Sequence, residues 1–268
     1  MVIEMDDLMN FFDCAVRFKL GNKLFDTHPV IATQRALVKT CQSMLRYMKL
    51  GDLERKNIPE ILNNMLVLHD ITETAYTKQR GILKASIKKA IMKAYWFYDT
   101  VGDLIDKEKL ISIQEDYQIR IEKDIFISGT IDLISCIKKP KSYFPMVLDS
   151  RKFGIGEKGR TLPTVLGASL AYRHLFKAKE SFVVHFNLFN EHKNRHRILD
   201  TDLIHLGYLC DMFQKAHEQK IFLPNFRFSC ATCPVIKECN GGGWIEDDFW
   251  KRKRWDTIAL RRQGKFND

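Results

Sequence analysis

The spacing of hydrophobic and polar residues changes twice along this chain. Apolar residues recur at helical spacing over three N-terminal ranges and predict helices at 5–20, 30–48 and 58–99, with an interruption in the last near Asp70 or Gly81. Three runs rich in β-branched and aromatic residues then predict strands at Ile111–Arg120, Ile125–Ile137 and Tyr143–Leu148. After a polar loop at 154–163, the pattern predicts a helix, a strand, a short strand and a helix at 164–177, Phe182–Phe189, 195–199 and 201–218.

This order of elements predicts an α/β fold with a mixed sheet flanked by helices, because strands and helices do not alternate strictly. A chain of 268 residues is long enough to bury a sizeable core without disulfide bonds. We expect one compact domain over residues 1–243, with a helical N-terminal subregion at about 28–100 packed on it. Residues 244–268 are expected to form a basic, aromatic tail.

Composition narrows the class of protein. The chain is 45% hydrophobic, which excludes disorder, and its net charge of +10 (43 Lys and Arg against 33 Asp and Glu) favours a polyanionic partner. Glu4, Asp6 and Asp7 precede any apolar run, so no secretory signal is expected. No stretch approaches the roughly 20 apolar residues of a membrane span. We therefore expect a cytoplasmic or other intracellular protein, in a reducing compartment, with no membrane partner.

The seven cysteines fall into two kinds. Cys41, Cys136 and Cys210 are isolated in apolar surroundings and are interpreted as buried thiols. Cys230, Cys233 and Cys239 instead form a C-x2-C-x5-C cluster, followed by three glycines. Unlike the isolated cysteines, these three lie in a predicted loop just past Pro224.

Two aspartates lie on neighbouring predicted strands. Asp132 is within the second strand, and Asp149 ends the third. Adjacent strands would bring the two carboxylates together, and with a backbone carbonyl they would form an oxygen-rich site suited to Mg²⁺ or Mn²⁺. Such an ion generates a hydroxide nucleophile and polarises a phosphate. The alternative interpretation is that both aspartates simply end strands at the surface.

Together these motifs resemble the PD-(D/E)XK nucleases, and in particular the RecB/AddB-like and CRISPR-associated exonucleases that carry an iron–sulfur cluster. The resemblance spans roughly residues 5–243 and rests on four segments in family order: Leu8–Phe18 with Cys14, Glu115 followed by Gly129–Asp132, Leu148–Gly154, and the C-terminal cysteines. It implies a PD-(D/E)XK mixed sheet with a C-terminal iron–sulfur loop.

The resemblance also implies roles for individual residues. Four thiolates would hold one 4Fe–4S cluster: Cys14, Cys230, Cys233 and Cys239. A structural zinc site with the same ligands is the chemical alternative. Asp132 and Asp149, with the Ser150 carbonyl, would hold Mg²⁺ or Mn²⁺, and Arg151 or Lys152 would orient the attacking water. Glu115 and Tyr172 are weaker candidates for supporting or substrate-contacting roles.

Three accessory positions depart from the family pattern. Arg151 stands where the family has lysine, no histidine lies near Gly81–Ala85, and Ala168 replaces the glutamine four residues before Tyr172. Arginine holds phosphate well but does not give up a proton to act as a base. The leading hypothesis is therefore a metal-dependent DNA exonuclease of replication, recombination or repair. The competing hypothesis is a catalytically weakened DNA-binding or scaffold subunit, and a zinc-stapled regulator is a third.

Two basic segments are candidate nucleic-acid contacts. Lys84 and Lys88 share one helix face in a segment without acidic residues, and Lys251, Arg252, Lys253 and Arg254 lie beside tryptophans in the tail. We expect DNA ends or single strands as the partner, with a helicase or another replication or recombination protein as a candidate protein partner. A solvated helix face and an aromatic anchor on a protein are the respective alternatives.

Overall fold

The computed structural model describes residues 1–19, 29–105, 110–122, 124–137, 142–151, 159–220 and 222. Its helices are α1 (Met5–Asp13), α2 (Ala15–Lys19), α3 (Pro29–Leu50), α4 (Ile58–Leu68), α5 (Arg80–Leu104), α6 (Pro163–Phe176) and α7 (Asp200–Gln219), with 3-10 turns η2 (Arg55–Asn57) and η3 (Thr77–Gln79). Its strands are β1 (Val2–Glu4), β2 (Ser112–Glu122), β3 (Ile125–Ile137), β4 (Ser142–Asp149), β5 (Ser181–Asn187) and β6 (His192–Ile198). Each segment predicted from the hydrophobic pattern corresponds to one or more of these elements.

The strands form one mixed sheet with β3 at its centre. β2 runs antiparallel along one edge of β3. On the other edge, β1 pairs in parallel with Phe126–Ser128, and β4 pairs antiparallel with Leu133–Ile137. β4 is parallel to β5, and β5 is antiparallel to β6. The C-terminal ends of β1 and β4 therefore point toward each other along one edge of β3, opposite Gly129–Asp132, and we call this place the β1–β4 junction.

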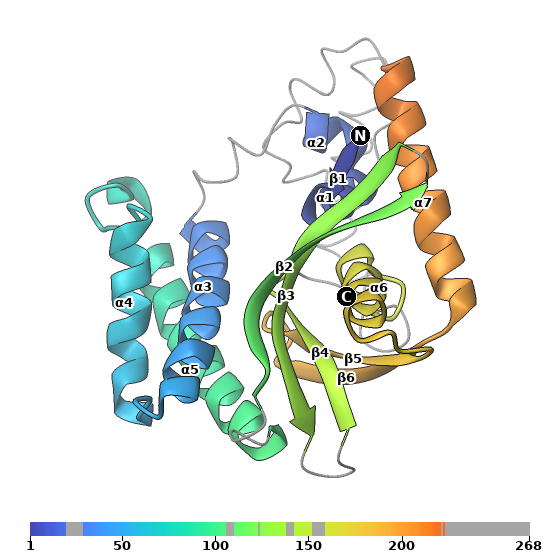
Figure 1. Cartoon of the computed structure of the whole chain (residues 1–268). Coiled ribbons are helices and arrows are strands. Elements are labelled where there is room, and N and C mark those ends of the chain that lie inside the picture. Colours follow the sequence, from blue (N-terminus) through green and yellow to red (C-terminus); the bar gives the residue numbers. More distant parts are fainter. Residues whose placement is uncertain are drawn as a thin grey trace, which may run out of the picture.

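Helices cover both faces of the sheet (Figure 1). On one face, α3, α4 and α5 pack in a core that includes Leu45, Phe97 and Phe186. On the other face, α1, α6 and α7 pack in a second core that includes Leu166 and Val183. The expected mixed sheet flanked by helices, with a helical block near residues 28–100, is confirmed. No helix in the described ranges is long and apolar enough to cross a membrane.

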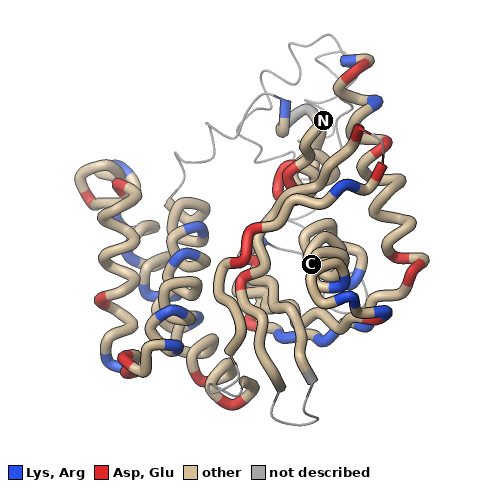
Figure 2. Tube along the Cα trace, in the orientation of Figure 1, with Lys and Arg blue, Asp and Glu red and all other residues tan. Residues whose placement is uncertain are grey.

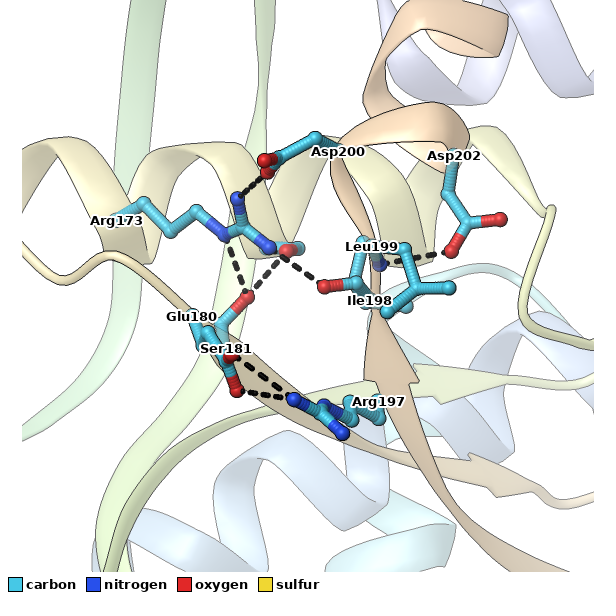
Figure 3. Close-up of polar contacts among 9 residues, drawn as sticks. Arg173, Glu180, Ser181, Arg197, Ile198, Leu199, Asp200 and Asp202 are labelled. Carbon is cyan, nitrogen blue, oxygen red and sulfur yellow. Dashed lines mark hydrogen bonds and ion pairs between the residues drawn. The ribbon is translucent and has the colours of Figure 1, made fainter.

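Polar contacts join α6 and α7 to the β5–β6 edge (Figure 3). Arg173 of α6 donates to the Asp200 carboxylate (2.6 Å), to the Ile198 carbonyl (2.5 Å) and to the Ser181 hydroxyl (3.3 Å). At the start of α7, the Asp202 carboxylate accepts from the Leu199 amide (2.8 Å), as a capping residue does. These contacts fix the strands that carry part of the candidate site.

Two features of the N-terminus differ from the sequence expectation. Residues 5–20 were expected to form one helix, but Cys14 has an extended backbone (φ −163°, ψ 111°) that separates α1 from α2. β1 was not predicted, because three residues are too few to show an alternation of period two. By contrast, the interruption expected near Asp70 is confirmed, since Asp70 follows α4 with a left-handed backbone (φ 53°).

Candidate functional site

The two predicted metal-binding aspartates both lie at the β1–β4 junction. Asp132 is in β3, between the segment that pairs with β1 and the segment that pairs with β4. Asp149 is the last residue of β4. A third carboxylate, Asp6, is in the first turn of α1, directly after β1. The charge of Asp6 raises the pKa of both other aspartates. The topology of the sheet thus gathers acidic residues from three distant parts of the chain.

Asp132 is buried, with 5% of its surface exposed. Its Oδ1 accepts a hydrogen bond from Gln42 Nε2 of α3 (2.6 Å), and its Oδ2 accepts one from the Leu148 amide (2.7 Å). Burial raises the pKa of Asp132 to about 6, although the two hydrogen bonds oppose this shift. Each carboxylate oxygen has two lone pairs, so Asp132 keeps capacity for a further ligand.

Asp149 is equally buried but less well paired. Its Oδ1 accepts from the Arg151 amide (2.9 Å), whereas its Oδ2 has no hydrogen-bond partner in the described part of the chain. His185 Nε2 lies 3.9 Å from that oxygen. Burial raises the pKa of Asp149 to about 6, against the opposing charge of Arg151. A buried carboxylate oxygen without a hydrogen-bond partner among the described residues is costly, so this atom is a candidate ligand for a cation or a polar group.

Arg151 lies beside Asp149, two residues after the end of β4. Its guanidinium donates to Asp6 Oδ1 (2.5 Å), and its Nε lies 3.9 Å from Asp149 Oδ1. The Asn187 side chain donates to the Arg151 carbonyl (3.0 Å) and so fixes the backbone after β4. Arg151 therefore bridges two carboxylates at the junction. Lys152 lies outside the described residues.

Sequence reasoning missed two side chains at this site. Gln42 is the α3 residue that reaches Asp132, 90 positions away in sequence, and no local signal marks it. His185 is 3% exposed, and neither of its ring nitrogens has a hydrogen-bond partner among the described atoms. Burial lowers the pKa of His185 to about 4, so the imidazole is neutral near pH 7. A lone histidine in an otherwise apolar strand was the available clue, and its parallel register with Val147 places it next to Asp149.

The donor set at the junction fits a hard divalent cation. Within the described ranges, no three His, Cys, Asp or Glu side chains form a group that could hold a metal ion. The predicted ligand set, however, has only two such side chains, Asp132 and Asp149, and a backbone carbonyl. All three donors are oxygens, as Mg²⁺ and Mn²⁺ prefer. The unpaired Asp149 Oδ2 is the atom best suited to accept such a cation.

The two weaker candidates lie apart from the aspartates to different degrees. Glu115 of β2 is in register with Ile131, next to Asp132, and its carboxylate accepts a hydrogen bond from Ser112. Tyr172 of α6 is buried against Phe176 and lies near Tyr143, at the opposite end of β4 from Asp149. No contact of Tyr172 with Asp132 or Asp149 is seen in the described part of the chain, and its role stays a prediction.

The predicted ligands of a cluster are described only in part. Cys14 is partly buried between α1 and α2, whereas Cys41, Cys136 and Cys210 are fully buried, as expected for structural thiols. Cys230, Cys233 and Cys239 lie outside the described residues. Among the described cysteines, Cys14 is thus the one whose side chain is partly exposed.

The predicted basic residues of α5 are exposed but partly neutralised. Lys84 forms an ion pair with Glu73 (3.2 Å), and Lys88 is exposed. Lys93, farther along the same helix, is half-buried and donates to the Phe189 carbonyl. The tail residues Lys251–Arg254 lie outside the described part.

Comparisons of this chain with models of known protein families and with curated proteins found no match in either case.

Proposed function

We propose that this chain is a divalent-metal-dependent deoxyribonuclease of the PD-(D/E)XK type, an exonuclease acting on DNA ends or single strands. The observation that carries the proposal is the pair of buried aspartates, Asp132 and Asp149, at one junction of a mixed sheet. Asp149 Oδ2 has no hydrogen-bond partner among the described residues. Buried carboxylates are retained at such cost where they are paired or bind a metal ion. The segments that carry both aspartates are those that resemble the nuclease family.

Asp132 and Asp149, with the Ser150 carbonyl, would hold Mg²⁺ or Mn²⁺. A bound cation of this kind supplies a hydroxide nucleophile and polarises the scissile phosphate. Gln42 and the Leu148 amide orient the Asp132 carboxylate, and the Arg151 amide orients Asp149. The Arg151 guanidinium would contact a phosphate oxygen and stabilise the charge that develops in the transition state.

We further propose that Cys14, Cys230, Cys233 and Cys239 hold a 4Fe–4S cluster. The support is the family resemblance together with the incomplete burial of Cys14, which the other described cysteines do not share. Such a cluster would tie the α1–α2 connection to the C-terminal cysteine segment and so restrain the chain.

A second candidate function is a catalytically weakened DNA-binding or scaffold subunit. The specific observation in its favour is the contact of Arg151 with Asp6, since it engages the residue that stands at the family's lysine position. An arginine held between carboxylates does not accept a proton from water. The two candidate functions predict different catalytic turnover but the same ligand, DNA.

Degradation of end-labelled single- and double-stranded DNA with Mn²⁺ separates these candidates. The test compares the wild type with Asp149→Asn, and the matched control is Asp211→Asn, at a partly exposed aspartate on α7 that pairs with Lys215. We expect the wild type and the control to degrade DNA and Asp149→Asn to lose the activity. Degradation that survives Asp149→Asn would refute the assigned site, and binding without degradation by the wild type would support the second candidate.

A further inference from the structure

A line of exposed cations runs along α3. Four basic residues define what we call the α3 basic face: Arg35, Lys39, Arg46 and Lys49. Their spacings of four, seven and three residues keep all four side chains within an arc of about 80°, because successive residues of an α-helix differ by about 100°. At 1.5 Å per residue, the line is about 21 Å long. Figure 2 shows these charges distributed along α3.

This line passes the candidate active site. Gln42 lies within the same arc, between Lys39 and Arg46, and its amide donates to Asp132. The charge of Lys39 also reaches Asp132, since it lowers the pKa of that carboxyl. Two members of the basic face therefore precede the contact with Asp132 along α3, and two follow it. A polyanion bound along this face would pass the contact between Gln42 and Asp132.

Three charges of this face are available to a ligand. Lys39, Arg46 and Lys49 form no ion pair with any residue in the described ranges. The α5 segment singled out from the sequence is different, because Arg80 and Lys84 share Glu73 and Lys93 is half-buried. Lys88 and Lys89 of α5 are exposed as well, so the feature that favours α3 for phosphate binding is its contact with Asp132 through Gln42.

A groove adjoins the C-terminal end of the face. It has a volume of about 330 Å³ and is lined by Arg46, Lys49 and Leu50 of α3 and by residues 111–113 at the start of β2. Leu50 and Ile111 are exposed there, so the groove offers apolar surface beside two cations. A nucleotide has matching chemistry, with a flat, weakly polar base and a charged phosphate. Proteins that bind single strands combine cations for the phosphates with stacking surfaces for the bases, most often aromatic side chains, and here the surface beside the cations is aliphatic.

We propose that the α3 basic face binds the phosphate backbone of a single nucleic-acid strand, with one nucleotide seated in the groove at its end. The part of this inference in which the α3 basic face delivers substrate to Asp132 and Asp149 rests on the proposed nuclease function. The binding itself does not depend on turnover. An acidic protein segment is the alternative ligand, and the experiment distinguishes it.

The test measures binding of the full chain to a fluorescently labelled 20-nucleotide oligo-dT in EDTA, at several salt concentrations. The variant is the triple substitution Lys39→Gln, Arg46→Gln and Lys49→Gln. The matched control removes the same charge from exposed residues of α5, as Lys84→Gln, Lys88→Gln and Lys89→Gln. Far-ultraviolet circular dichroism and thermal unfolding confirm that both variants remain folded, as expected for exposed positions.

Each lost phosphate contact reduces the log–log salt slope by about 0.7, so the α3 variant should lose about 2 from the slope. At 0.1 M salt this corresponds to roughly 100-fold weaker binding. The α5 control should change both quantities much less. Equal losses in the two variants, or no loss in the α3 variant, would overturn the proposal.

Two further arms complete the design. A labelled poly-glutamate peptide of equal length should bind weakly, and binding as tight as that of oligo-dT, with the same loss in the α3 variant, would identify an acidic protein segment as the ligand instead. Failure of the nuclease proposal would give a different result: the wild-type protein would bind oligo-dT through α3 but would not degrade it. If the wild type degrades DNA and the α3 variant does so with unchanged KM, the present inference fails while the nuclease proposal stands.

Discussion

Replacing Asp149 by asparagine should stabilise the protein while abolishing its proposed activity. Asparagine is a neutral analogue of the protonated acid and has nearly the same shape. Its carbonyl can still accept from the Arg151 amide, and its amide group would take the place of Oδ2, toward the unprotonated imidazole of His185. The substitution therefore removes a buried charge without leaving a cavity.

The magnitude follows from the pKa of this carboxyl, which burial raises from 3.8 to about 6. The unfolded chain releases the proton near 3.8 and the folded protein near 6, so the folded state binds more protons between these values, and stability falls as pH rises through this window. Above this pH window, the charge on Asp149 lowers the free energy of unfolding by about 3 kcal/mol, at 1.36 kcal/mol per pKa unit. For a domain of this size, that free energy corresponds to roughly 5 °C in Tm.

Thermal unfolding in EDTA from pH 4 to pH 7.5 tests this prediction. The Tm difference between Asp149→Asn and wild type should be near zero at pH 4 and reach its full value above pH 6. Asp211→Asn, at a partly exposed position on α7, should show no such rise. Added Mn²⁺ should stabilise the wild type and narrow the difference, because only the wild type keeps both carboxylate ligands. A destabilised variant at pH 7.5, or a difference independent of pH, would refute this account of Asp149.

Three other predictions concern residues with different surroundings. Asp132→Asn should stabilise the protein less than Asp149→Asn or should destabilise it, because both Asp132 oxygens accept hydrogen bonds and an amide nitrogen would face one of the donors. Chemical unfolding in EDTA measures this effect, and a gain in the free energy of unfolding equal to that of Asp149→Asn would contradict the prediction. Gly167→Ala should lower the free energy of unfolding by about 1–3 kcal/mol, since a Cβ there would overlap the Tyr117 hydroxyl and lie 2.8 Å from Met5 Cγ. An unchanged midpoint of urea unfolding would show that the Tyr117 and Met5 side chains move aside freely. Cys14→Ser should remove iron, sulfide and brown colour from anaerobically purified protein, and wild-type protein that holds zinc and is colourless would refute the cluster.

The sequence predicted the elements well and the site only partly. Helices and strands with several turns or alternations leave a clear period, which is why β3 and α6 were placed within a residue or two. The break at Cys14 follows no glycine or proline, so no local signal announces it. Asp132 and Asp149 were found because carboxylates are unusual in apolar strands. Gln42 and His185 were missed because their roles depend on the packing of α3 and on the register of β5, and both are properties of the folded sheet.

The division of the interior into two cores has a consequence for local unfolding. The α3–α5 block is one continuous stretch of chain that packs on a single face of the sheet, so it is suited to open as a cooperative unit while the other face remains folded. The hydrogen bond from Gln42 to Asp132 crosses the boundary of that unit, and opening would expose the carboxylate to water. A cation that requires the closed arrangement would therefore slow amide hydrogen exchange throughout α3 and α5, far beyond the residues that touch it. Exchange in α7, on the opposite face, would be affected much less.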